Sequence, residues 1–183
     1  MPTIVSHAAV PLAIGLGLGS GIVSRRLLLA GVAASIVPDL DVLAFRVGIA
    51  YGDAFGHRGF THSIGFACVL AFVAWLSAKK LFTDRVTAAW FVGISTLSHG
   101  LLDMLTNGGH GVALWWPIST QRIFAPWRVI EASPLSLRRI LGGRGVELLQ
   151  SEMLWVWLPA AVLLAVLWLV RRARSRQVLG SPR

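Results

Sequence analysis

Apolar stretches close to the length of a bilayer-spanning helix recur along this chain. The sequence has 183 residues, of which 55% are hydrophobic and only 14% are charged, and its mean hydropathy is +0.70. A soluble domain carries about 25% charged residues. In lipid, a chain must satisfy its backbone hydrogen bonds internally, which a helix of about 20 apolar residues achieves. The sequence therefore predicts an all-α, polytopic membrane helix bundle, formed as a single integral membrane domain over residues 1–183.

We expect about five transmembrane helices, and no cleavable signal pattern separates the first from the rest. A kink is expected at Pro38, because proline removes one helical hydrogen bond. The connection over about 107–152 is interfacial, since its Trp and Arg residues suit the headgroup region. It includes a short amphipathic helix expected from Pro134 to Leu141. The expected spans are 8–23, 27–37 with a continuation to about 49, 62–78, 86–105 and 153–170.

Basic residues set the orientation of these spans. The net charge is +9, and Lys and Arg are concentrated in short connections on one side and in a tail over about 171–183. The positive-inside rule places this side in the cytoplasm, and we expect a multi-pass protein of the inner (plasma) membrane. Membrane lipids are the expected partners of this charge. No nucleic-acid partner is expected, because the basic residues form no single stripe. The residues on this side are Arg25, Arg26, Lys79, Lys80, Arg85, Arg171, Arg172, Arg174 and Arg176.

Three polar motifs interrupt the apolar stretches. They are Pro38-Asp39-Leu40-Asp41, the segment from His57 to Ser63 (His-Arg-Gly-Phe-Thr-His-Ser), and the segment from Ser98 to Asp103 (Ser-His-Gly-Leu-Leu-Asp). An ionisable side chain near membrane depth costs on the order of 3 kcal/mol or more unless it is paired or functional. With spans that alternate in direction, all three motifs and His7 fall on the non-cytoplasmic face. This coincidence indicates one shared site on that face.

The residue types in these motifs favour a metal site. Imidazole beside carboxylate suits zinc, manganese or iron. His99 and Asp103 are four residues apart and project from one helix face, as two ligands to one ion would; a buried His–Asp pair is the alternative. Asp39 and Asp41 point the same way if the chain is extended after the proline, so either can be the ligand. The expected metal ligands are His7, Asp39, His62, His99 and Asp103, with His7 alternatively a plain interfacial residue.

Catalytic roles are expected for Asp41, His57 and Arg58. Asp41 or a histidine could be the general acid or base, and Arg58 could hold a substrate phosphate through paired N–H donors. The alternative for Arg58 is a side chain that extends to water.

Three further residues carry local expectations. Thr61 is expected to cap the third span, and Cys68 is expected to pack inside it, since a single cysteine forms no disulfide within one chain. His110 is expected in a loop, with a ligand or acid role as the alternative.

The ordered motifs resemble those of a known family. An early His, Pro-Asp-x-Asp, His-Arg-Gly-x-Thr-His-Ser, Ser-His-x-x-x-Asp, Leu-Thr-Asn-Gly-Gly and Leu-Trp-Trp-Pro, over about residues 7–118, are similar to the YdjM-like family of prokaryotic membrane-bound metal-dependent hydrolases. The resemblance implies a multi-helix inner-membrane protein with a metal site. From the residue types we expect a divalent metal ion there, with zinc favoured over manganese or iron.

The ligand order is also similar to that of the all-helical zinc-dependent phospholipase C and single-strand nuclease group. The downstream His-x-x-x-Glu of that group is not matched at Glu131, Glu147 or Glu152, which argues against a third metal ion.

The expected function is hydrolysis of a phosphoester or lipid-linked substrate by water that one or two divalent ions activate. The alternative is a metal-binding protein or metal-ion carrier without hydrolytic activity, and no polar residues continue toward the cytoplasm to serve a carrier. Haem held by His62 and His99 is a third possibility, against which the neighbouring carboxylates argue. The sequence leaves the oligomeric state open.

Overall fold

A computed structural model describes residues 1–133 and 144–180 of the chain. These residues form helices and no β-strand, with isolated bridges joining residues 106 to 130 and 112 to 123. The all-α class is therefore confirmed. The α-helices are α1 (Ala9–Leu18), α2 (Arg25–Ile36), α3 (Ile64–Leu76), α4 (Arg85–Met104), α6 (Arg144–Glu152) and α7 (Leu158–Gly180). Three 3₁₀ helices, η1 (Ser6–Ala8), η2 (Val37–Val47) and η3 (Phe60–His62), and a π-helix, η4 (Met153–Trp157), complete them.

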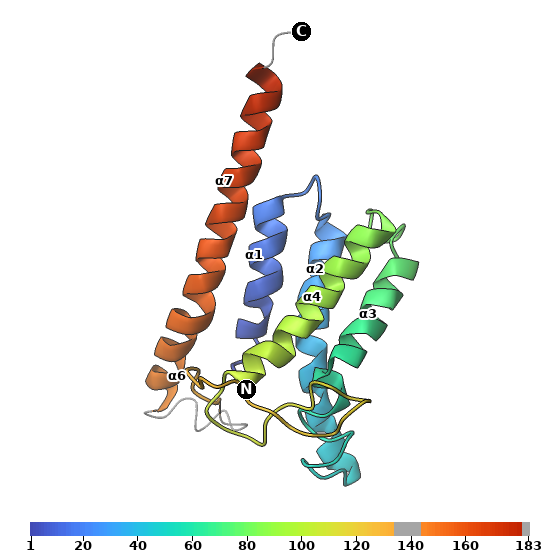
Figure 1. Cartoon of the computed structure of the whole chain (residues 1–183), viewed down its shortest axis with the longest axis vertical. Coiled ribbons are helices and arrows are strands. Elements are labelled where there is room, and N and C mark those ends of the chain that lie inside the picture. Colours follow the sequence, from blue (N-terminus) through green and yellow to red (C-terminus); the bar gives the residue numbers. More distant parts are fainter. Residues whose placement is uncertain (134–143, 181–183) are drawn as a thin grey trace.

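The long helices run alternately up and down in one bundle (Figure 1). Helix α4 packs against α2 and α3, and α1 packs against α7. The α1–α2 and α3–α4 connections lie at the end of the bundle toward which α7 extends, and the N-terminus lies at the other end. This alternation is the arrangement that the polar motifs need in order to meet.

Two helical stretches are long and apolar enough to cross a membrane, judged by length and composition. They cover residues 25–47, which combine α2 and η2, and residues 145–177. The apolar helices Ser6–Leu18 and Ile64–Leu76 are shorter. At about 1.5 Å per residue, the 10 residues of α1 cover about half of the hydrocarbon core. Five full transmembrane helices are therefore not confirmed.

The ends of the first and last helices differ most from the expected ranges. The first helix ends at Leu18, because Gly19 adopts a positive φ of 80° that continues no helix. At the other end of the chain, α7 continues to Gly180, so the basic segment after residue 170 begins as part of a helix. The amphipathic helix expected from Pro134 to Leu141 lies outside the described residues.

Two further expectations about the third helix are wrong. Ser63, and not Thr61, is the N-cap of α3, since its hydroxyl oxygen accepts the Phe66 N–H at 3.1 Å. Cys68 is exposed on the outside of α3 and does not pack in the bundle. A capping residue needs a non-helical backbone next to the first helical turn, and Thr61 lies inside η3.

Small residues bring α2 and α4 close together. Gly31 of α2 lies against the Phe91 ring of α4, which leaves no room for a side chain at that position. Close approach of backbones at small residues is the usual way in which membrane helices associate. This contact fixes the position of α4 along the axis of α2, and so places the C-terminal end of α4 beside the C-terminal end of α2. The buried core here comprises Val23, Leu27, Ala34, Ala74, Ala78, Ala88, Phe91 and Val92.

Candidate metal centre

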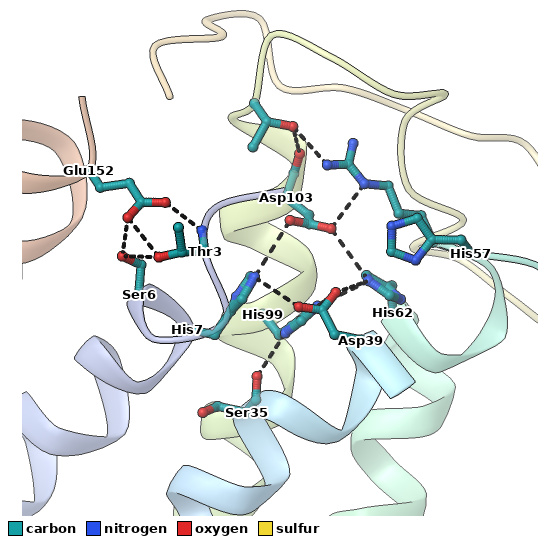
Figure 2. A network of polar contacts seen from close by, with 12 residues as sticks. Thr3, Ser6, His7, Ser35, Asp39, His57, His62, His99, Asp103 and Glu152 are labelled. Carbon is teal, nitrogen blue, oxygen red and sulfur yellow. Dashed lines mark hydrogen bonds and ion pairs between the residues drawn. The ribbon is translucent and has the colours of Figure 1, made fainter. Parts of the chain in front are cut away.

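The three polar motifs meet at the end of the bundle that holds the N-terminus (Figure 2). One ligand atom from each of four residues lies within 4.8 Å of the other three. A fifth residue from η1, His7, lies against them. Each of the five is between 0 and 2% exposed. The four mutually close residues are Asp39 from η2, His62 from η3, and His99 and Asp103 from α4.

His62 and His99 face each other through their Nε2 atoms at 3.0 Å. Each ring uses its other nitrogen elsewhere: His99 Nδ1 lies 2.7 Å from the Ser35 carbonyl, and His62 Nδ1 lies 3.2 Å from Asp41 Oδ2. An imidazole that donates from Nδ1 presents a lone pair at Nε2 unless it carries a second proton. The two opposed atoms therefore need either one shared proton or a cation.

Pro38 explains why the Ser35 carbonyl is available to His99. Helix α2 ends at Ile36 and continues as the 3₁₀ helix η2, in which each carbonyl accepts from the residue three positions later. Ser35 itself lies in the last turn of α2, where carbonyls lose their regular helical partners, and the residue three positions later, Pro38, has no N–H to replace them. The kink expected at Pro38 is thus present as a change of helix type, and it supplies the acceptor that orients His99.

Asp39 and Asp103 direct carboxylate oxygens at the two imidazoles. Asp39 Oδ1 lies 3.4 Å from His99 Nε2, and Asp103 Oδ2 lies 3.4 Å from His62 Nε2. All four oxygens of these carboxylates are buried without a hydrogen-bond partner in the described part of the chain, and the ion pair of Asp103 Oδ2 with Arg58 Nε, at 3.0 Å, offsets one of the two charges. Such burial is strongly unfavourable unless a cation compensates it. Ligand atoms bound at about 2.0–2.2 Å around one tetrahedral ion lie about 3.4 Å apart, so this donor set fits a divalent metal ion.

His7 closes the side of the centre next to η1. Its ring stacks on that of His99 with centroids 3.6 Å apart, and its Nε2 lies 3.7 Å from one oxygen of Asp39 and one of Asp103. Neither ring nitrogen has a hydrogen-bond partner among the described residues. His7 is therefore placed to add a fifth ligand atom to the same ion.

Asp41 differs from Asp39 in that protein donors surround it. It accepts hydrogen bonds from the His57 ring at 2.6 Å, the Arg58 N–H at 3.1 Å and the Thr61 hydroxyl at 2.7 Å. Asp41, His57 and His62 also lie close enough together to hold an ion. The full set of donors nevertheless suits a carboxylate that orients His62 from behind, as carboxylates commonly do for metal-bound histidines.

The expectation of an extended chain after Pro38 is wrong. Residues 37–47 form a 3₁₀ helix, so Asp39 and Asp41 do not point the same way. Asp39 faces the His7 and His99 rings, and Asp41 faces the loop that carries His57.

The pKa of His62 reflects its two carboxylate neighbours. Burial lowers this pKa, while the neighbouring carboxylates of Asp103 and Asp41 raise it, with a net result of about 9. Without a metal ion, His62 therefore carries a second proton at neutral pH, and its Nε2–H can donate to His99. A metal ion bound at the same place must displace that proton.

Comparison with known proteins places this chain in a family. The family described as YdjM inner membrane protein matches residues 1–176. The chain belongs to this family. It is 49% identical to inner membrane protein YbcI of Escherichia coli (strain K12) over 173 residues, which cover 94% of this chain and 100% of that protein. It is 43% identical to inner membrane protein YdjM of the same strain over 72 residues, or 35% of this chain and 32% of that protein. No solved structure matches.

These comparisons confirm the family resemblance and the inner-membrane localisation. The YdjM family and both relatives carry inner membrane in their descriptions, and two helices of this chain are suited to crossing a membrane. The site described above therefore lies in an inner-membrane protein of the YdjM family.

Arg58 of this YdjM-family chain points inward, and the alternative of a side chain extended to water is wrong. It is 1% exposed and has a positive φ of 61°. Its Nε lies 3.0 Å from Asp103 Oδ2, Nη1 donates to the Gly108 carbonyl at 2.8 Å and Nη2 donates to the Thr106 hydroxyl at 3.0 Å. The guanidinium thus offsets the charge of Asp103.

His110 lies apart from the cluster. It is exposed, and its ring contacts that of Tyr51 with centroids 4.5 Å apart. In the described part of the chain it joins neither group of potential ligands, so its placement agrees with the expected loop residue.

Glu152 is a buried residue that sequence reasoning missed. It is 2% exposed, and it accepts hydrogen bonds from the Thr3 backbone N–H, the Thr3 hydroxyl at 2.8 Å and the Ser6 hydroxyl at 2.7 Å. These bonds tie the segment that precedes His7 to the end of α6 (Figure 2). A lone acidic residue directly before an apolar helix is the signal that could have indicated such a role.

Proposed function

We propose that this protein is a membrane-bound, metal-dependent hydrolase that acts on a phosphoester, with zinc favoured over manganese or iron. The supporting observation is the set of four buried carboxylate oxygens, none with a hydrogen-bond partner among the described residues, beside the opposed Nε2 atoms of His62 and His99. Histidine nitrogens together with carboxylates form the ligand set of many hydrolytic metal sites.

Asp39, His62, His99 and Asp103 would hold the ion, with His7 beside them. A divalent ion in such a site lowers the pKa of a coordinated water to near neutrality and stabilises negative charge that develops on the substrate. The Ser35 carbonyl and Asp41 fix the orientation of the two imidazoles. Arg58 balances Asp103, which limits the cost of burying two carboxylates together.

His57 is the proposed general acid or base. Its Nδ1 is held by Asp41 at 2.6 Å, which leaves Nε2 free to exchange a proton. The side chain also lines a polar cavity of about 170 Å³, so the exchange can occur next to bound substrate. A carboxylate that orients a histidine in this way is a recurring device for proton transfer.

A metal-ion carrier is the second candidate. Its support is the same buried cluster at one end of a helical bundle in an inner-membrane protein. The pairing of Asp41 with a histidine that lines a cavity favours the hydrolase, because a carrier needs no acid or base beside its ion.

Turnover by the purified, full-length protein in detergent tests the proposal. We expect hydrolysis of a p-nitrophenyl phosphate mono- or diester, loss of activity with a chelator, and recovery with zinc or manganese. His99→Ala should remove both bound metal and activity, while His57→Gln should retain metal and lower turnover by roughly 100-fold or more. Cys68→Ala, on the outside of α3, is the control and should match the unmodified protein. Stoichiometric metal without turnover on any ester, together with metal transport into proteoliposomes, would instead favour the carrier.

A further inference from the structure

A small polar cavity adjoins the proposed metal centre. Its volume is about 170 Å³, which is room for five or six water molecules at about 30 Å³ each. Pockets for whole drug-sized ligands measure about 300–1,000 Å³. The cavity can therefore take a headgroup or a terminal phosphate, and not an entire lipid. Its lining residues are Met1, Tyr51, His57, Arg58, Gly109, Ala132 and Ser133.

The walls of this cavity are suited to an anion. None of its described lining residues is acidic. Arg58 contacts Asp103, Gly108 and Thr106 through one N–H at each nitrogen, which leaves two of the five guanidinium N–H groups for another partner. A second guanidinium, that of Arg122, lies directly behind the wall, since it donates to the backbone carbonyls of His57 at 2.8 Å and Tyr51 at 2.9 Å.

Gly109 keeps two donors open to the cavity. Its φ is 86°, and a Cβ at this position would lie 2.8 Å from both Arg58 Nη1 and the Tyr51 hydroxyl oxygen. Any larger residue would therefore cover the Arg58 and Tyr51 donors, as well as strain the backbone. The space that a side chain would fill is the space between these two donors.

We propose that this cavity binds the terminal phosphate of an anionic phosphate monoester, with Arg58 and Tyr51 as its donors and His57 beside it. Arginine binds phosphate well because its planar N–H groups match two phosphate oxygens. Because Arg58 also contacts Asp103, a phosphate on its free N–H groups lies next to the proposed metal ligands. The inference rests on the proposed hydrolase function and adds Tyr51 and Gly109 as specificity-determining residues.

Phosphate binding, measured separately from turnover, tests this site. Metal-loaded, full-length protein in detergent is titrated calorimetrically with inorganic phosphate, and metal content is determined for each variant. Tyr51→Phe removes one hydrogen bond to a charged group and should weaken phosphate binding by roughly 10-fold or more. Ala132→Leu should fill the cavity and abolish binding. Ala125→Leu, a half-buried position of the same connection outside the cavity, is the matched control and should bind phosphate normally.

The results separate this site from the hydrolase proposal. If no ester is hydrolysed but phosphate binds and both cavity variants weaken phosphate binding, the phosphate site is supported and the hydrolase function is refuted. If esters are hydrolysed while both cavity variants bind phosphate normally, the cavity assignment is overturned. Loss of metal from Ala132→Leu would also count against it, because that change should affect the anion alone.

Further titrations distinguish the two sources of such a phosphate. Glycerol 3-phosphate represents a soluble ester, and phosphatidic acid in detergent micelles represents a lipid. Competition by phosphatidic acid at concentrations where glycerol 3-phosphate has no effect indicates a lipid headgroup, and equal competition indicates a soluble ester. Phosphatidylcholine micelles, whose phosphate is a zwitterionic diester, should not compete, and strong competition by them would contradict the assignment of an anionic monoester.

Discussion

His62 Nε2 and His99 Nε2 lie 3.0 Å apart in the buried end of the bundle, each held there from its opposite side. Asp41 fixes the His62 ring and the Ser35 carbonyl fixes the His99 ring. The separation is close to that of two histidine nitrogens that bind one zinc ion with metal–nitrogen bonds of about 2.0–2.1 Å. A single proton can occupy this position in the absence of metal, so metal and proton compete for it.

Asp103 should be required for metal binding. Asp103→Asn preserves the size of the side chain but removes the charge that faces His62 and His7. We therefore expect metal affinity to fall by more than about 100-fold. Replacing a residue that only hydrogen-bonds to a metal ligand usually costs about 10- to 100-fold. Metal analysis of the purified protein measures this. Asp84→Asn is the matched control: Asp84 is the exposed N-cap of α4, and asparagine caps a helix equally well. Equal metal content in the two variants would refute the ligand assignment.

Asp41 should affect metal affinity less than Asp103 does. In Asp41→Asn the amide oxygen can still accept one hydrogen bond, but the orientation and basicity of His62 suffer, so a loss of about 10- to 100-fold is expected with unchanged stoichiometry. A competition titration with a chelator gives both values. A drop from two ions to one would show instead that Asp41, His57 and His62 hold an ion of their own.

Gly100 should be needed for the approach of α4 to η3. A Cβ at Gly100 would lie 2.5 Å from the His62 carbonyl oxygen, so Gly100→Ala must push η3 away and separate His62 from His99. We expect weaker metal binding in a folded protein, measured by the same titration and by thermal unfolding. Gly52→Ala is the control, since no described atom lies within 4 Å of a Cβ there. Unchanged metal affinity in Gly100→Ala would mean that the 3.0 Å contact is not needed for binding.

The meeting of the polar motifs could be predicted because it depends on simple rules. His99 and Asp103 share a helix face by their spacing alone, and the alternation of helices brings the ends of α2 and α4 to the start of α3. The 3₁₀ helix η2 could not be predicted, since it depends on how residues 37–47 pack against the loop that follows. The different directions of the Asp39 and Asp41 side chains result from that 3₁₀ helix.

Long-range contacts explain most of what the sequence did not reveal. Glu152 hydrogen-bonds to Thr3, 149 residues away, and no local pattern encodes such a pair. The inward direction of Arg58 likewise depends on acceptors at Thr106 and Gly108. The length of the first span was overestimated because hydropathy registers apolar residues, whereas the end of α1 is set by the conformation of Gly19.

Metal affinity should rise with pH. Because the pKa of His62 is raised to about 9, metal binding at lower pH releases a proton from this ring, and affinity should increase by up to about tenfold per pH unit until the pH approaches 9. Chelator competition at pH 6, 7 and 8 measures the slope. Asp41→Asn removes one of the carboxylates that raise this pKa, so the slope in that variant should flatten at a lower pH. An affinity that is independent of pH in both proteins would contradict metal binding at His62 Nε2.

The metal centre should lie on the non-cytoplasmic side of the inner membrane. Arg25 and Arg26 begin α2, and Lys79 and Lys80 lie in the α3–α4 connection. Both places are at the end of the bundle opposite the metal centre (Figure 1), and such short basic segments remain in the cytoplasm. A reporter that is active only outside the cytoplasm should therefore be active when fused after Gly109 and silent when fused after Arg176. Replacement of the four basic residues by glutamine should reduce this asymmetry, because no other short connection carries as much positive charge. The opposite pattern of reporter activity would place the metal centre and its phosphate cavity on the cytoplasmic side, where soluble phosphate esters would become the natural substrates.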